Sequence, residues 1–221
     1  MAEFEVLKPE EIEARSMAII AGELSDRRRA RALAGGGPVA PRTPLEEAVL
    51  KRVIHTTADF DFDESLFFTH DAAEAGARIL KDAPQLVTDT QMALAGINKR
   101  VLAANGGSAA CFIADEDVAA EAKKRGTTRA AVAVEKAAAV CGGNLVFAIG
   151  NAPTALIRIS ELIREGRLAP RLIIGVPVGF VNVSASKELL FDLDIPCIIA
   201  RGNKGGSNIA AAIVNALQYA E

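Results

Sequence analysis

The chain has 221 residues, half of them hydrophobic, and a formal net charge of −3. This length suits one large α/β domain with a substantial core, and no excess of positive charge attracts nucleic acid or an anionic membrane. No apolar run approaches the roughly 20 residues that a membrane-spanning helix needs. We therefore expect a globular domain without nucleic-acid or membrane partners.

The first predicted element is an amphipathic helix over 9–24, with acidic residues early and apolar residues at helical spacing. We expect 25–44, which contains the arginine cluster 27–29, three consecutive glycines and three prolines, to be a loop that extends the domain, with a short helix resuming near Leu45. No aromatic residue alternates with the arginines, so a solvated helix end is favoured over a nucleic-acid surface. The first fifteen residues lack the pattern of a secretory leader, which favours a cytoplasmic location.

From residue 45 onwards, short β-like runs alternate with helical patterns. The expected strands are 52–57, 85–89, 109–113, 145–149, 171–176 and 196–200. The expected helices are 64–80, 90–103, 115–124, 128–140, 153–165, 184–191 and 205–219. This alternation predicts a single doubly wound α/β domain over 1–221, with a mostly parallel sheet and helices on both faces.

Polar and glycine-rich segments follow the predicted strands, where open α/β sheets bind their ligands. The turn at 150–154 predicts a helix start whose backbone N–H groups can bind an anion. Segment 201–207 adds two cations to a glycine-rich turn, and 175–179 lets the backbone approach a bulky ligand. Each loop alone is explained by ordinary turn chemistry, but three at one sheet edge favour a binding site.

His55 is the main candidate for chemistry. It is one of only two histidines, and it lies near the end of the expected strand 52–57 beside Thr and Asp residues that could orient its ring. An imidazole suits proton transfer near neutral pH. A lone histidine is more often structural, so the residues alone leave catalysis as a hypothesis. His70, in an expected surface helix, has no such indication.

Other types of site lack the residues they need. The three cysteines are widely spaced in apolar runs, which indicates reduced core thiols. Asp59, Asp61 and Asp63 resemble the start of a calcium loop, but the required Gly and Glu are missing. Neither metal-ligand spacing nor a nucleotide or acyl-transfer motif is present. We expect no protein-bound metal and no cofactor.

Taken together, the loop sequences resemble the precorrin-8X methylmutase (precorrin isomerase) family. The resemblance rests on RVIHTTADFDF, LVTDTQMALAGI, GTTRAA, IGNAPTAL, GVPVGF with SKELL, and RGNKGGS, in that order. It extends from about residue 10 to residue 219 and so covers nearly the whole chain. It implies a homodimer with the pocket near the subunit interface.

The resemblance also implies an isomerase of cobalamin biosynthesis. A methyl group moves from C11 to C12 of the corrin macrocycle of precorrin-8X, or of its cobalt-bearing counterpart, to give hydrogenobyrinate or cobyrinate. The reaction is formally a 1,5-sigmatropic shift, which implies no nucleophile, redox cofactor or protein metal. The histidine of the R-V-I-H segment, here His55, is implied as the acid that protonates the ring.

A corrin substrate is a largely apolar disc with carboxylates around its rim, which cations and helix N-termini can bind. The residues expected to contact it are Arg15, Ser16, Thr88, Asp89, Arg129, Asn151, Lys187, Arg201 and Lys204. Lys187 has the alternative of a solvated helix residue, and Arg15 that of an ion pair with Glu11. Ala130 departs from the Ser of many relatives, so we expect no hydroxyl contact there.

Two other functions stay open at this point. A non-catalytic tetrapyrrole-binding protein would keep the arginines and glycines but could dispense with His55. An unrelated α/β enzyme acting on a phosphorylated metabolite would also use anion-binding loops, and it would ignore corrinoids.

Overall fold

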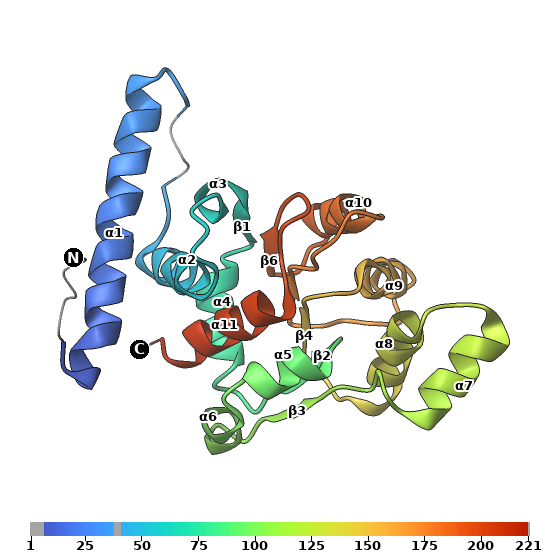
Figure 1. Cartoon of the computed structure of the whole chain (residues 1–221). Coiled ribbons are helices and arrows are strands. Elements are labelled where there is room, and N and C mark those ends of the chain that lie inside the picture. Colours follow the sequence, from blue (N-terminus) through green and yellow to red (C-terminus); the bar gives the residue numbers. More distant parts are fainter. Residues whose placement is uncertain (1–6, 38–40, 221) are drawn as a thin grey trace, which may run out of the picture.

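The computed structural model describes residues 7–37 and 41–220, which form a six-stranded sheet covered by helices (Figure 1). The strand order is β1-β6-β5-β4-β2-β3. Neighbouring strands are parallel except for β1, which is antiparallel to β6. The strands are β1 (Leu66–Thr69), β2 (Gln85–Thr88), β3 (Ser108–Ala110), β4 (Leu145–Ile149), β5 (Leu172–Gly175) and β6 (Cys197–Ala200).

Helices account for most of the remaining described chain. They are α1 (Pro9–Leu33), α2 (Pro44–Thr57), α3 (Phe62–Ser65), α4 (Ala72–Ile79), α5 (Gln91–Gly96), α6 (Lys99–Ala104), α7 (Glu116–Arg125), α8 (Arg129–Val140), α9 (Pro153–Arg164), α10 (Val183–Glu188), the 3-10 helix η1 (Leu189–Asp192) and α11 (Ser207–Gln218). No helix among these described residues is long and apolar enough to cross a membrane.

The two faces of the sheet are buried under separate sets of helices. On one face, α2, α4 and α11 form a core with alternate strand residues such as Val146 and Ile174. On the other face, α8, α9 and η1 pack on the intervening residues, such as Phe147 and Ile173. Every residue of β4, β5 and β6 is buried, as the continuous apolar runs of a doubly covered parallel sheet require. The predicted doubly wound α/β fold is confirmed.

The prediction of a strand at 52–57 is wrong, because these residues are the last turns of α2. Thr43 caps this helix in a capping box with Glu46, and Pro44 occupies its first turn. The buried residues of α2 are Val49, Leu50, Val53 and Ile54. This spacing forms one stripe of a helix, and the tertiary contact with α11 outweighs the β-propensity of the β-branched residues.

The N-terminal helix is longer than predicted, and the expected loop 25–44 is correspondingly shorter. Helix α1 continues to Leu33, beyond the predicted end at residue 24. Arg28 in this extra segment donates to Asp63 at 2.6 Å and to Glu47 at 3.0 Å, which ties α1 to α2 and α3. Figure 1 shows α1 beside α2, at the edge of the molecule and away from the sheet.

A further difference lies in the expected helix 64–80, because its first part contains the strand β1. Strand β1 is an antiparallel edge strand rich in phenylalanine, and it is followed by His70 and Asp71 in the left-handed region. This turn breaks the helical pattern, and α4 starts only at Ala72. His70 therefore lies in a turn, with its Nε2 atom 3.0 Å from the carbonyl oxygen of Leu193.

Candidate active site

His55 lines a cleft of about 770 Å³ between the N-terminal helices and α11. A volume of this size is in the usual range for a small-molecule site. The cleft walls come from α1, α2, α5 and α11, four elements far apart in sequence. The lining residues are Glu13, Arg52, His55, Thr56, Met92, Gly96, Asn208, Ala211, Ala212, Asn215 and Tyr219.

Helix α2 delivers His55 to this cleft from its last turn. The helix ends at Thr57, and the left-handed conformation of the next residue, Ala58, turns the chain away. The side chain of His55 is exposed, so its ring is accessible from the cleft. Its neighbour Thr57 does not orient the ring as expected, because the Thr57 hydroxyl donates to the carbonyl of Val53 at 2.9 Å.

Glu13 and Arg52 form an ion pair in the same cleft, with 2.6 Å between Arg52 Nη2 and Glu13 Oε1. The hydrogen bond and charge of Arg52 lower the pKa of the Glu13 carboxyl, and His55 adds to this effect. Neither residue is among those predicted from the sequence to belong to the site. Arg52 precedes His55 by three residues, which places the two side chains on one face only if the segment is helical.

The N-terminus of α11 joins this cleft to the carboxyl ends of β2 and β4. The hydroxyls of Thr90 and Ser207 are 2.7 Å apart. A Cβ atom at Gly150 would be 2.6 Å from the Cα atom of Ser207, so only glycine fits there. Asn208, the next residue along α11, lines the cleft.

Asp89 occupies the anion-binding turn that the sequence predicted for the substrate. Its carboxylate accepts hydrogen bonds from the backbone N–H groups of Gly150 (2.9 Å), Asn151 (2.8 Å) and Ala152 (2.6 Å). Burial raises the pKa of Asp89, and these N–H groups oppose the shift. The turn therefore binds the protein's own anion, while the side chain of Asn151 is exposed.

Thr88 is also part of this buried support. It is 1 % exposed, and its hydroxyl donates to the carbonyl of Thr90 at 3.0 Å. The side chains of Thr88 and Asp89 are therefore both buried in this chain, and their expected contact with substrate stays a prediction.

The cations of segment 201–207 have partners within the chain. Arg201 forms a two-bond ion pair with Glu188, at 2.8 and 2.7 Å, and lies over the rings of Phe191 and Phe67. Lys204 donates to Asp59 at 2.7 Å and to Asp61 at 2.6 Å. These two hydrogen bonds raise the pKa of Lys204.

Lys187 is not the solvated helix residue that was the alternative to a substrate contact. It is 0 % exposed, and its Nζ atom donates to the carbonyls of Gly202 and Lys204, both at 2.7 Å. Burial lowers the pKa of Lys187 to about 8. Its ammonium group lies under the loop that it holds, and not at the surface.

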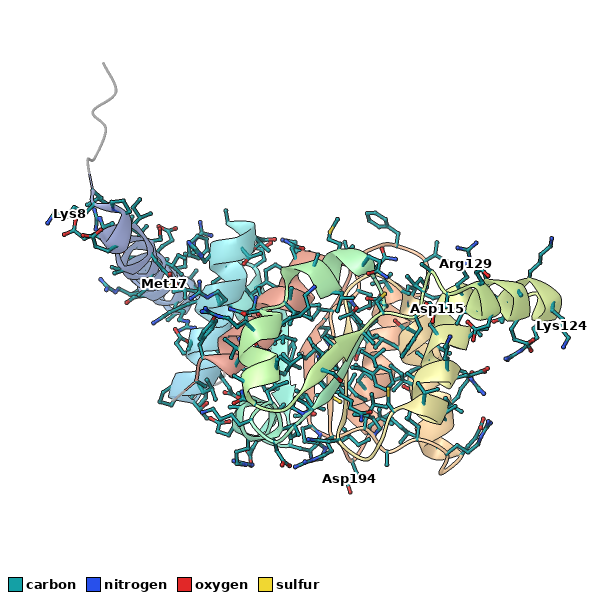
Figure 2. The ribbon with its side chains drawn as sticks, turned by 90° about the horizontal axis from the view of Figure 1, so that it is seen from below. Lys8, Met17, Asp115, Lys124, Arg129 and Asp194 are labelled. Atoms are coloured by element: carbon teal, nitrogen blue, oxygen red, sulfur yellow. The ribbon has the colours of Figure 1, made fainter. Side chains whose placement is uncertain are left out.

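Arg129, Arg15 and Ser16 lie on two separate parts of the molecule. Arg129 is the exposed first residue of α8, and the other two are on α1. Figure 2 shows Arg129 on the far side of the sheet from Met17, which is the residue after Ser16. One chain therefore does not bring these three residues together.

Comparisons with known proteins agree with this architecture. Residues 11–220 match the sequence profile of the precorrin-8X methylmutase family. The chain is 45 % identical over 214 residues to a cobalt-precorrin-8 methylmutase of Salmonella typhimurium, covering 97 % of this chain and 96 % of that one. It is 40 % identical over 174 residues to a precorrin-8X methylmutase of Pseudomonas aeruginosa, covering 77 % and 82 % of the two chains.

A solved structure agrees as well. The crystal structure of a precorrin-8X methylmutase from Thermus thermophilus superposes with a TM-score of 0.81 at 35 % sequence identity. The match covers 95 % of this chain and 94 % of the Thermus chain.

Proposed function

Because the chain belongs to the precorrin-8X methylmutase family, we propose that it moves a methyl group from C11 to C12 of precorrin-8X or cobalt-precorrin-8. The products are hydrogenobyrinate and cobyrinate, which makes the protein an isomerase of cobalamin biosynthesis. The observation that carries the proposal is the family match over residues 11–220, joined to a cleft that contains His55. Residues 1–221 are proposed to form one catalytic domain.

His55 is the proposed proton donor. In the shift one carbon–carbon bond breaks at C11 and one forms at C12, so the substrate and the product are isomers. A proton delivered to the ring system draws electron density from the migrating centre and lowers the barrier. Because the product gains no proton overall, the same imidazole takes the proton back. The exposure of His55 in the lining of the cleft supports this role.

The carboxylates on the substrate rim need cationic and polar partners, and we assign two groups of residues to this task. Arg15, Ser16, Arg129, Asn151 and Lys204 have polar atoms at or near the surface and are proposed to contact substrate directly. Arg201 joins them if its pair with Glu188 exchanges for a substrate carboxylate. Thr88, Asp89 and Lys187 are proposed to support the loops from beneath, since their side chains are buried.

We also propose that the protein is a homodimer with its pocket near the subunit interface. Several large apolar side chains are exposed in the single chain: Phe180 (90 %), Leu33 (84 %), Val181 (77 %) and Met92 (70 %). A second copy would cover such residues. Light scattering after gel filtration measures the mass, and a species near 23.2 kDa, the mass of one chain, would contradict the dimer.

A cytoplasmic location is part of the proposal. Its support is that Cys111, Cys141 and Cys197 are all free, as expected in a reducing compartment. Fractionation of the native cells, with detection by an antibody against the protein, tests the location.

The activity test is to incubate the purified protein with precorrin-8X and, in parallel, with cobalt-precorrin-8. We expect the absorption spectrum of at least one of them to change to that of the rearranged corrin. Binding of corrinoid without a spectral change would instead support the non-catalytic tetrapyrrole-binding alternative. Binding of sugar phosphates or nucleotides with no response to corrinoids would support the phosphorylated-metabolite alternative.

A further inference from the structure

A buried lysine holds the glycine-rich segment 201–207 from beneath. Lys187 has no exposed surface, and its ammonium group donates to the carbonyls of Gly202 and Lys204 at 2.7 Å each. Burying a charge without a charged partner is unfavourable, so an arrangement of this kind needs a compensating role. The next residue, Glu188, binds Arg201 at the start of the same segment. Helix α10 thus fixes the first half of the segment at three points.

The second half of the segment packs directly on the loop after β5. The N–H group of Gly206 donates to the carbonyl of Val176 at 2.8 Å, and the N–H group of Gly179 donates to the carbonyl of Asn203 at 3.1 Å. A Cβ atom at Gly205 would collide with the carbonyl oxygen of Val176. The backbone of the segment therefore has one closely defined position.

Lys204 extends from this fixed backbone to the chain that leaves α2. Its Nζ atom donates to Asp59 at 2.7 Å and to Asp61 at 2.6 Å. The turn between these aspartates is closed by a hydrogen bond from the N–H group of Asp61 to Asp59 Oδ1 at 3.0 Å. His55 is only four residues before Asp59, so the lysine holds the end of the helix that carries the proposed proton donor.

We propose that Lys187 is a positioning residue for His55, acting through the segment 201–207, Lys204 and the Asp59–Asp61 turn. The inference rests on the proposed function, in which His55 protonates the substrate. The hydrogen bonds run from α10 through segment 201–207 to the Asp59–Asp61 turn that follows α2, and the bonds made by the two lysines are 2.6–2.7 Å long.

The contact between Lys204 and the two aspartates holds the end of α2 in place but adds little to the stability of the fold. The side chain of Lys204 is 47 % exposed and that of Asp61 is 72 % exposed, and ion pairs this exposed contribute little to the stability of a fold. Removing them should therefore leave the fold intact and release the end of α2. A displacement of about 1 Å in a catalytic group is enough to slow a reaction by about a hundredfold.

The positional effect is measured in the free protein by NMR of its histidine side chains. Since the chain has only two histidines, 15N-histidine labelling gives two sets of imidazole signals, one from His55 and an internal control from His70. The variants are Lys187→Met, Lys204→Met and the double variant Asp59→Asn/Asp61→Asn. Lys136→Met is the matched control, because Lys136 also binds two aspartates, Asp115 and Asp117, at 2.7 Å each.

We expect the three test changes to shift or broaden the His55 signal and to leave His70 unmoved, with neither signal affected by Lys136→Met. In turnover assays Asp59→Asn/Asp61→Asn and Lys187→Met should lower kcat by about tenfold to a hundredfold, with KM within about twofold. Lys204→Met should add a rise in KM if Lys204 also binds a substrate carboxylate.

An unchanged His55 signal in both Lys187→Met and Asp59→Asn/Asp61→Asn would overturn the inference. Equal movement of His55 and His70 would overturn it too, since it would indicate general repacking. If the wild type did not convert precorrin-8X or its cobalt form, the proposed function would fail. The NMR comparison would still decide whether the contacts position His55.

Discussion

Replacing Lys187 by Met should make the stability of the protein depend differently on pH. Burial lowers the pKa of Lys187 from 10.5 to about 8. Between these values the folded chain has released the proton and the unfolded chain still holds it, so the unfolded state binds more protons. The free energy of unfolding of the wild type must therefore rise with pH relative to Lys187→Met. At about 1.4 kcal/mol per pH unit, the full gain is about 3 kcal/mol.

At pH 7 the same variant should fold and differ from the wild type by no more than about 2 kcal/mol. The variant loses two charge-assisted hydrogen bonds to backbone carbonyls. It also escapes the unfavourable burial of an ammonium group, and the near-equal length of Met preserves packing. The two effects oppose each other, which keeps the variant usable in the NMR and kinetic tests.

Urea denaturation followed by circular dichroism at several pH values from 7 to 10 measures this difference. Lys136→Met is the control, because its aspartate partners raise the pKa of Lys136, and its contribution stays constant over this range. Above pH 8 the free energy of unfolding of the wild type should rise steadily relative to that of Lys187→Met. The wild type and Lys136→Met should show the same dependence of this free energy on pH. Parallel curves for the wild type and Lys187→Met would refute the lowering of the Lys187 pKa by burial.

Three other changes test separate parts of the structure. Asp89→Ala should lower the free energy of unfolding by about 2–4 kcal/mol in urea denaturation, because it leaves three N–H groups without their acceptor; Asp117→Ala, at an exposed ion pair, should leave it nearly unchanged. Gly205→Ala should lower the melting temperature through backbone collision, whereas Gly22→Ala, which meets nothing within 4 Å in α1, should raise stability by about 0.5–1 kcal/mol. Arg129→Ala should raise KM by about tenfold without changing stability, if it binds a substrate carboxylate; an unchanged KM would remove it from the site.

The central strands were predictable because their sequences leave few alternatives. Strands β4, β5 and β6 are short apolar runs of Leu, Val, Ile and Ala, and their positions agree with prediction to within about a residue at each end. Helix α2 was not predictable from 52–57 alone, since β-branched residues there favour a strand locally. The capping residues Thr43 and Glu46 lie well before residue 52. Their role is recognised only when the whole segment from Pro44 to Thr57 is taken as one helix.

The candidate site also has some residues that the sequence predicts and others that it does not. His55 and Lys204 are visible in sequence because rare or charged residues lie beside distinctive loops. The contacts of these loops cannot be predicted from the sequence. For example, the Asp89 carboxylate binds a turn that lies about 60 residues later in the chain. Glu13 and Arg52 lie 39 residues apart and meet only when α1 packs on α2. Such contacts depend on tertiary packing, which no local pattern specifies.

The central claim is that His55 protonates a corrinoid in the cleft. The most direct measurement compares wild type, His55→Ala and His70→Ala in the conversion of precorrin-8X and cobalt-precorrin-8, with corrinoid binding measured separately. We predict that His55→Ala loses turnover by about a hundredfold or more while it still binds corrinoid, and that His70→Ala keeps wild-type turnover. Turnover by His55→Ala at the wild-type rate would contradict the claim.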